Sequence, residues 1–158
     1  MLVHTIPPVY DGNSKILILG SFPSVKSREQ GFFYGHPQNR FWKVLASVFS
    51  DEIPDTVARK RDFLLKHGVA VWDVIGECDI VGSSDLSIKN VKSNDIGAIL
   101  KSAKIERIFL NGKTAEKYYK KYLEKRVGIA ATCLPSTSPA NAICGLEKLI
   151  AAWKIIRD

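Results

Sequence analysis

The chain has 158 residues, of which 46% are hydrophobic and 25% charged, and it carries a formal net charge of +7. These values are typical of one globular domain with its own core. No stretch approaches the ~18 consecutive apolar residues of a transmembrane helix, and no targeting segment is visible. The basic excess favours a polyanionic partner such as nucleic acid, and a solubilising surface is the alternative.

The cysteines indicate a reducing environment. Cys78, Cys133 and Cys144 form no C-x-x-C pair, and three thiolates cannot alone fill a four-cysteine metal site. We therefore expect reduced thiols in a cytoplasmic protein, associated with the nucleoid if the source is prokaryotic.

Strands and helices are predicted to alternate along the chain. In chain order, the expected elements are a strand at 15–19, helices at 39–49 and 55–67, a strand at 69–75, a long surface connection at 76–93, a helix ending near 103, a strand at 105–110, a helix at 114–125, a strand at 127–134 and a helix at 139–156. Gly68 is expected to cap the second helix, and Pro139 fits only the first turn of the last. This alternation predicts an α/β fold with a parallel or mostly parallel sheet, formed by residues 1–158 as a single domain.

Two turn-rich loops begin where predicted strands stop. The first runs from Gly20 to Ser24 and continues from Tyr34 to Trp42, and the second runs from Leu134 to Asn141. Loops at the carboxyl ends of parallel strands meet at one edge of an open α/β sheet, where ligands bind. We therefore expect the two loops to form one site, although about a hundred residues separate them.

These loops resemble the active-site motifs of the uracil-DNA glycosylase superfamily. The resemblance lies in Gly20-Ser21-Phe22-Pro23-Ser24, in His36-Pro37-Gln38-Asn39-Arg40-Phe41-Trp42, which is most similar to the mismatch-specific branch, and in Pro135-Ser136-Thr137-Ser138-Pro139. It implies a three-layer α/β/α fold with a four-stranded parallel sheet. It also implies an enzyme that flips a damaged base out of DNA and hydrolyses its N-glycosidic bond, acting as a monomer on double-stranded DNA without metal or other cofactor.

Two positions depart from the family pattern. Phe22 stands where most branches have the Asp or Asn that positions water, and Leu134 stands where the uracil-specific branch has a His that stabilises the departing base. Either the site is inactive or another residue carries the role. The hypoxanthine-DNA glycosylase branch also lacks the first-motif acid or amide, and its catalytic Asn matches Asn39. The chain most resembles that branch, so hypoxanthine, the deamination product of adenine, is the expected base.

The chemistry of glycosidic cleavage is compatible with an amide at position 39. The reaction passes through a cation-like sugar, so the water needs orientation more than a strong base, and an amide can orient it by accepting a hydrogen bond. Asn39 also precedes an apolar helical run, so its position alone favours a helix N-cap.

Two further residues are candidates for holding the flipped base. Tyr34 matches the family position whose ring stacks on that base, and packing within the loop is the alternative. Asp73, at the end of the second predicted strand, resembles the family Asn that reads the edge of the base. Its carboxylate can accept a hydrogen bond from N1–H of hypoxanthine, which adenine lacks. A strand-end cap is the alternative.

The remaining candidates would contact the DNA strand. Arg40 is expected to reach a phosphate or to pair with an acid. The hydroxyls and N–H groups of residues 136–138 at a helix start would suit a phosphate, and the resemblance implies that residues 139–141 enter the minor groove. The predicted site comprises catalytic Asn39, the base-pocket residues Gly20, Ser21, Phe22, Pro23, Tyr34 and Asp73, and the DNA-binding residues Arg40, Ser136, Thr137, Ser138, Pro139, Ala140 and Asn141.

Other segments are given structural roles, and two other functions stay open. His36, between Gly35 and Pro37, is expected to fix its loop, and Asn111-Gly112 is interpreted as a tight turn.

A uracil or G:U mismatch glycosylase is the alternative within the class. A non-catalytic damaged-DNA-binding module on the same fold is the alternative from another class.

Overall fold

Four parallel strands form the central sheet of the protein, whose residues 1–158 are all described by a computed structural model. The strand order is β3-β2-β6-β7, with β2 at Ile16–Gly20, β3 at Val69–Asp73, β6 at Arg107–Asn111 and β7 at Ala131–Leu134. Every residue of β2 is buried, because a central parallel strand is covered on both faces. The predicted four-stranded parallel sheet is confirmed.

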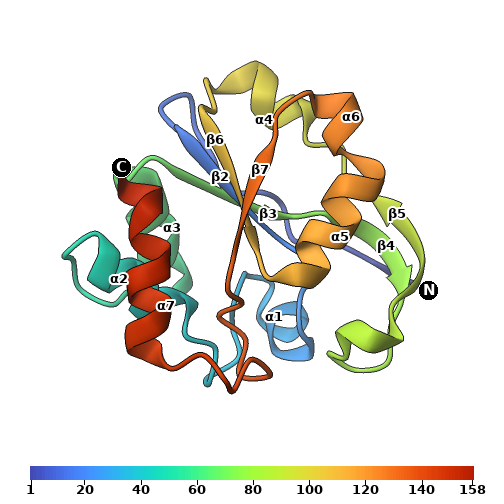
Figure 1. Cartoon of the computed structure of the whole chain (residues 1–158), viewed down its shortest axis with the longest axis horizontal. Helices are drawn as coiled ribbons and strands as arrows, with labels where there is room; N and C mark the ends of the chain where they lie inside the picture. Colours follow the sequence, from blue (N-terminus) through green and yellow to red (C-terminus); the bar gives the residue numbers. More distant parts are fainter.

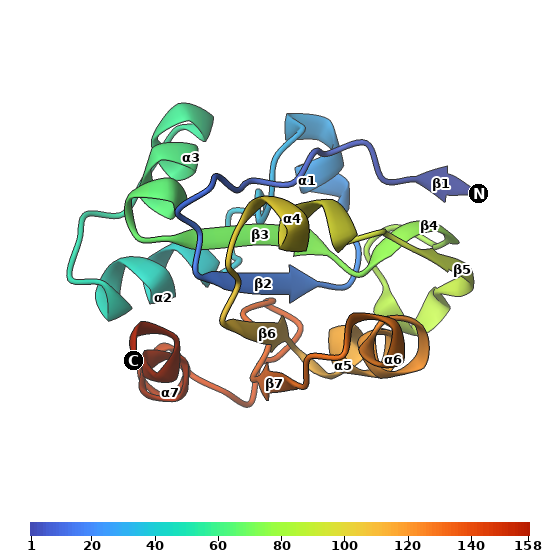
Figure 2. The same ribbon diagram turned by 90° about the horizontal axis from the view of Figure 1, so that it is seen from above.

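Helices cover both faces of this sheet. Ile16 and Ile18 point into a core shared with α2 (Phe41–Val48), α3 (Val57–Lys66) and α7 (Leu146–Trp153). Leu17 and Leu19 point into a second core shared with α4 (Gly97–Ser102) and α5 (Lys113–Tyr122). Figures 1 and 2 show α2, α3 and α7 together on one side, with α5 and α6 (Glu124–Val127) on the other. The expected three-layer α/β/α architecture is thus confirmed.

A second, smaller sheet lies beside the first and was not anticipated. It is antiparallel in the order β1-β4-β5, with β1 at Leu2–Val3, β4 at Ile75–Asp79 and β5 at Lys89–Ser93. The prediction of a plain surface connection over 76–93 was therefore wrong. Register shifts between β4 and β5 interrupt the pairing, and such irregularity breaks the alternation by which a strand is recognised in sequence.

The closing helix is shorter than the sequence indicates. It begins at Leu146 rather than Pro139 and continues after Trp153 only as a 3-10 turn over Lys154–Arg157. The hydroxyls of Ser136 and Ser138 accept the N–H groups of Ser138 and Ala140, respectively. Such local side-chain bonds compete with helical hydrogen bonds, so residues 135–145 form a long loop instead.

Other differences are small. The short helix α1 (Val25–Gln30) was not expected, and α4 begins at Gly97 instead of at a cap on residue 93 or 94. Gly68 follows α3 with a φ of 70°, as expected of a residue that ends a helix. No helix has both the length and the apolar character needed to cross a membrane.

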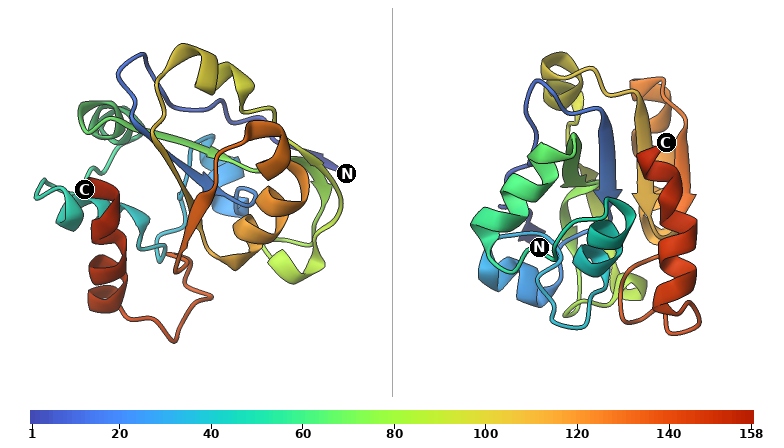
Figure 3. Two further views of the ribbon diagram at one scale, coloured as in Figure 1. Left: turned by 45° about the horizontal axis from the view of Figure 1, so that its top comes forward. Right: turned by 90° about the vertical axis from the view of Figure 1, so that its left-hand side faces the viewer.

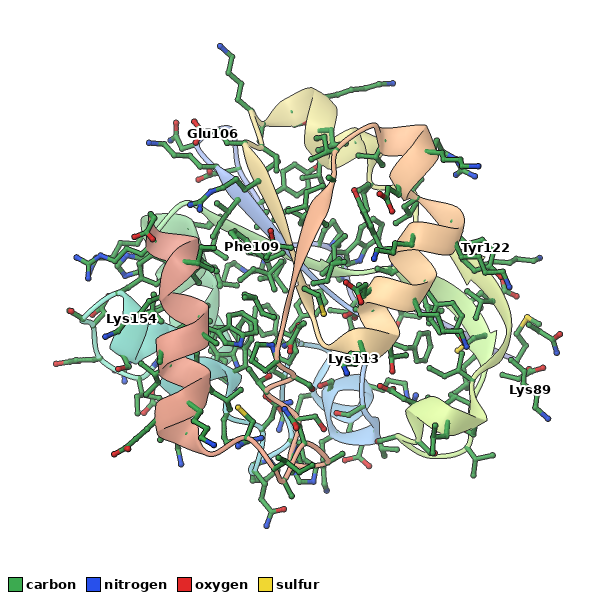
Figure 4. The ribbon with its side chains drawn as sticks, viewed as in Figure 1. Lys89, Glu106, Phe109, Lys113, Tyr122 and Lys154 are labelled. Atoms are coloured by element: carbon green, nitrogen blue, oxygen red, sulfur yellow. The ribbon has the colours of Figure 1, made fainter.

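Strand register brings the functional loops to one edge. Gly20 at the end of β2 is opposite Asp73 at the end of β3, and Asn111 at the end of β6 is opposite Leu134 at the end of β7. In Figure 4, Glu106 and Lys113 mark the two ends of β6, and Lys113 lies at the end where the loops gather. Figure 3 shows the segment before α2 and the segment before α7 at this same end.

The two-sided burial of β2 predicts a large contribution to stability. Replacing Leu17, which is fully buried, by alanine should lower the free energy of unfolding by about 2–5 kcal/mol. Leu86→Ala is the matched control, because Leu86 is 100% exposed and should change that free energy by no more than about 0.5 kcal/mol. Urea unfolding followed by circular dichroism measures both, and equal losses would contradict the assignment of Leu17 to the core.

Candidate active site

A cavity of about 470 Å³ lies at the carboxyl edge of the central sheet and is walled by both motif loops. Twelve of the predicted site residues line it: Gly20, Ser21, Phe22, Pro23, Tyr34, Asn39, Asp73, Ser136, Thr137, Ser138, Pro139 and Ala140. Arg40 and Asn141 stand outside its wall. The cavity is also lined by Asp85 and Leu86, which the sequence did not single out, and by Asn111, which was interpreted only as part of a turn.

The first loop is held by α1. Ser24 caps this helix by accepting the N–H of Ser27, and the buried Ser27 hydroxyl accepts the N–H of Gly35 at 3.0 Å. Nδ1 of His36 accepts the N–H of Gln38 at 3.1 Å, which agrees with a structural role for that imidazole. These hydrogen bonds between neighbouring residues hold the first loop in place at the cavity wall.

Tyr34 occupies a strained position on this loop. Its φ of 52° is left-handed, a conformation that is costly for an aromatic residue and that clusters at functional sites. Its ring stacks on Phe41 with centroids 3.8 Å apart and planes 16° apart, so packing occupies one of its faces. The hydroxyl is buried without a hydrogen-bond partner. Burial, followed by the nearby Asp73 carboxylate, raises the pKa of Tyr34 far above its usual range. Stacking of a base on this ring stays a prediction.

Asn39 stands at the junction of the loop, the cavity and α2. Its Oδ1 accepts the N–H of Phe41, the first residue of α2, at 2.9 Å. This contact satisfies a helix-terminal donor, as the capping interpretation expects. The residue is half-buried and lines the cavity. A carbonyl oxygen has two lone pairs, so capping leaves one acceptor site and the Nδ2 donors for a second task.

Asp73 brings a buried carboxylate to the cavity. Its Oδ2 lies 2.8 Å from Nε2 of His4, and the two side chains are 5% and 0% exposed. The carboxylate thus bonds a side chain 69 positions away instead of capping its own strand. His4 was missed by the sequence analysis, because a lone histidine near the start of the chain carries no motif that would link it to Asp73.

The two positions that depart from the family pattern are apolar in the structure as well. Phe22 and Leu134 are both buried among hydrophobic residues, although Phe22 also lines the cavity. A different polar pair lines the cavity, where the Ser21 hydroxyl donates to Asp85 at 3.4 Å. Burial raises the pKa of Asp85. The usual positions for water activation and base stabilisation therefore offer no polar side chain.

The second loop is pinned to the end of β6. Thr137 is fully buried, its N–H is accepted by Asn111 Oδ1 at 3.0 Å, and its hydroxyl accepts from Asn111 Nδ2 at 3.0 Å. Because the N–H groups of Ser138 and Ala140 are also bonded within the loop, the expected helix start with free N–H groups was wrong. Contact of the loop with DNA stays a prediction.

Arg40 joins the two motifs. Its guanidinium donates to the carbonyl oxygens of Ser138 at 2.9 Å, of Asn141 at 3.0 Å and of Cys144, and its backbone N–H donates to Thr137. It forms no pair with an acid. The predicted phosphate contact is untested, but in this structure the side chain holds the second loop in shape.

An exposed aliphatic side chain projects from the same loop. Ile143 is 94% exposed. It follows by three residues Ala140, which lines the cavity. The sequence analysis assigned this loop only small residues for contact with the minor groove. It missed Ile143 because that position was placed inside a helix expected over 139–156, whereas the helix begins only at Leu146.

The fold and the cavity define an α/β protein with a cavity where four parallel strands end, which is the edge at which such folds bind ligands. A model of the Uracil DNA glycosylase superfamily matches residues 7–157, and the chain belongs to this superfamily. A relative from Methanosarcina acetivorans named hypoxanthine DNA glycosylase is 34% identical over 143 residues, covering 89% of each chain. A relative of the same name from Methanosarcina barkeri is 31% identical over 137 residues, covering 85% of each.

A solved structure agrees with this assignment. The solution NMR structure of a candidate uracil DNA glycosylase from Methanosarcina acetivorans matches with a TM-score of 0.80 and 28% identity, covering 97% of both chains. The resemblance inferred from the motifs is confirmed at the level of the superfamily and the fold.

The contacts of Arg40 predict that it orders the second loop. Arg40→Ala should raise amide hydrogen exchange in peptides spanning 138–145 by roughly 10-fold or more, because it removes three charge-assisted bonds. Arg40→Lys should restore little, since one ammonium lacks the planar fork. The control is Arg59→Ala, which removes only an exposed pair with Asp55. Unchanged exchange in Arg40→Ala would contradict the assignment.

Proposed function

We propose that the protein is a monofunctional DNA glycosylase that hydrolyses the N-glycosidic bond of hypoxanthine in double-stranded DNA, as a step of base excision repair. One observation carries the proposal: the Asn39 amide and the Asp73 carboxylate line one cavity, while the usual catalytic positions, Phe22 in the cavity wall and Leu134 in the core, are apolar. The names of the two Methanosarcina relatives support the same base. The alternative within the class is uracil, alone or in a G:U mismatch.

Base selection follows from the hydrogen-bonding capacity of Asp73. An ionised carboxylate only accepts hydrogen bonds. Hypoxanthine offers N1–H at its Watson–Crick edge, whereas adenine has a bare N1 there. A flipped hypoxanthine therefore gains a charge-assisted bond to Asp73, and a flipped adenine places a lone pair against the carboxylate. The ring face of Tyr34 opposite Phe41 would stack on the base and offset part of the cost of extrusion.

Asn39 would act on the attacking water. The C1′–N9 bond breaks, the electron pair leaves with the base, and the sugar becomes cation-like before water adds to C1′. The proton that the water releases neutralises the departing base anion, so the products are free hypoxanthine and an abasic sugar. The Asn39 carbonyl can accept a hydrogen bond from that water and direct its oxygen towards the sugar, and its dipole stabilises the positive charge. No lysine stands in either motif, so we assign no lyase step and expect an abasic site as product.

The DNA strand would be gripped by the second loop. We place Arg40 and residues 136–141 beside the backbone and assign Ile143 to the base stack, because an exposed aliphatic side chain can enter a base step and help hold a nucleotide out. We further propose that the enzyme acts as a monomer in the cytoplasm, where chromosomal DNA would be its substrate.

Cleavage of an inosine-containing duplex, read after alkali treatment, tests the reaction and the role of Asn39. Asn39→Ala and Asn39→Ser should both lower the single-turnover rate by roughly 100-fold or more, the usual cost of losing a group that acts on the transition state. Serine can still accept the N–H of Phe41, so only alanine should lose about 1 kcal/mol of stability. Gln38→Ala, at the exposed neighbouring position, should retain the wild-type rate.

The same assay distinguishes the rival functions. Cleavage of uracil but not inosine would replace hypoxanthine by uracil in the proposal. Tight binding of damaged duplex with no product from any deaminated base would favour a non-catalytic module. Full activity of Asn39→Ala would remove Asn39 from the mechanism while leaving the reaction in place.

The exposure of Ile143 predicts a strand-dependent effect. Ile143→Ala should lower inosine excision from duplex DNA by roughly 10-fold, since the cost of unstacking a base is a few kcal/mol, and should barely change excision from a single strand. Ile53→Ala is the control, because Ile53 is 56% exposed but lies between α2 and α3, outside the cavity wall. Equal losses on both substrates would contradict a wedge role.

A further inference from the structure

A buried histidine, His4, is paired with Asp73 in the cavity wall. His4 follows the short strand β1, and its backbone N–H donates to Gly76 at 2.7 Å. Its imidazole thereby reaches across to the end of β3, where Nε2 lies 2.8 Å from Asp73 Oδ2. Both side chains are almost completely shielded from solvent. In such a buried environment a hydrogen bond to a charged group is strong, and its loss is costly.

The contact with Asp73 determines which ring nitrogen of His4 carries a hydrogen. An ionised carboxylate accepts only, so Nε2 of His4 must be the donor. Nδ1 is buried with no hydrogen-bond partner, which leaves Asp73 as the single side-chain partner of this imidazole. Aromatic rings confine it further, with centroids 5.9 Å away at Phe22, 6.2 Å at Phe33 and 6.1 Å at Trp72. These rings surround the imidazole in the orientation that places Nε2 against Asp73.

The contact also determines which carboxylate oxygen is left for a ligand. Oδ2 is engaged by His4, whereas Oδ1 lies beside Gly20 at the cavity wall. A Cβ added to Gly20 would collide with Oδ1 and come within 3.0 Å of the Tyr34 hydroxyl. The missing side chain at position 20 is thus what gives Oδ1 its place at the wall. One acceptor of fixed direction remains.

We propose that His4 is a positioning residue for base recognition: by holding Oδ2 of Asp73 it presents Oδ1 as an acceptor to a ring N–H of the flipped base. The inference rests on the proposed glycosylase function and deepens it. It defines the substrate class as bases with an N–H at this edge, such as N1–H of hypoxanthine or N3–H of uracil. Bases whose edge nitrogen is bare or methylated are excluded.

The test compares two substrates and two variants. The substrates are duplexes containing inosine or 1-methylinosine, which lacks N1–H. His4→Phe keeps an aromatic ring among its aromatic neighbours but removes the donor, and His4→Gln restores an N–H at similar reach. In wild type we expect much faster excision of inosine than of 1-methylinosine. His4→Phe should lower the rate of inosine excision by roughly 10- to 100-fold and leave the rate of 1-methylinosine excision nearly unchanged. His4→Gln should recover most of the wild-type ratio of the inosine rate to the 1-methylinosine rate.

The control is a second histidine–aspartate pair outside the cavity wall. His67 Nε2 lies 2.8 Å from Asp51 Oδ2 at the C-terminal end of α3, so His67→Phe should leave both rates at the wild-type level. A purely structural role for His4 would instead lower both rates together in His4→Phe, with no recovery of the ratio in His4→Gln. That result would overturn the inference.

A second measurement needs no substrate and separates this inference from the proposed function. ¹⁵N NMR of the ring nitrogens should find hydrogen on Nε2 of His4, and hydrogen on Nδ1 alone would overturn the positioning role. If wild type cuts uracil but not inosine, the choice of hypoxanthine fails, and the same ratio is measured with uracil and 3-methyluracil. Absence of any excision would refute the glycosylase function and, with it, the role of His4 in base recognition.

Discussion

The site depends on the register of four parallel strands. Because parallel strands all end at the same edge, Gly20, Asp73, Asn111 and Leu134 come together although more than a hundred residues separate the first from the last. The side chains of a strand alternate between its faces, so a slip of one residue would reverse every one of them. A slip of β3 against β2 would move the Asp73 carboxylate away from both His4 and the cavity. The buried aliphatic residues of β2 and β3 fix the register and therefore also fix the chemistry.

Polar contacts within the protein then shape the loops. The first loop is braced by Ser27, and the second is held by Asn111 from the sheet and by Arg40 from the start of α2. These contacts satisfy backbone groups that a loop at a cavity wall would otherwise leave without partners. The loops are ordered during folding, so a ligand meets a formed surface and loses less conformational entropy on binding.

Local sequence patterns predicted the parts of the structure that depend on residues close together in the chain. The buried strands, most helices, the two motif loops and their meeting at one edge all follow from apolar periodicity and strand-end chemistry. The β1-β4-β5 sheet escaped detection because its strands are short and irregularly paired, and the loop over 135–145 did so because serine hydroxyls replace helical bonds. His4 could not be identified from the sequence for another reason. Its importance lies in a contact with Asp73 that exists only in the folded chain.

The contacts of Arg40 have a consequence for how affinity responds to ionic strength. Each phosphate that a protein neutralises releases counterions, and the logarithm of affinity falls with the logarithm of salt concentration by about 0.9 per phosphate. Three of the five donors of the Arg40 guanidinium bond loop carbonyls, so two remain for a phosphate. The arginine inside the most conspicuous motif would thus hold the second loop in shape and still add to the salt dependence of DNA binding. Loop order and counterion release would be linked through a single side chain.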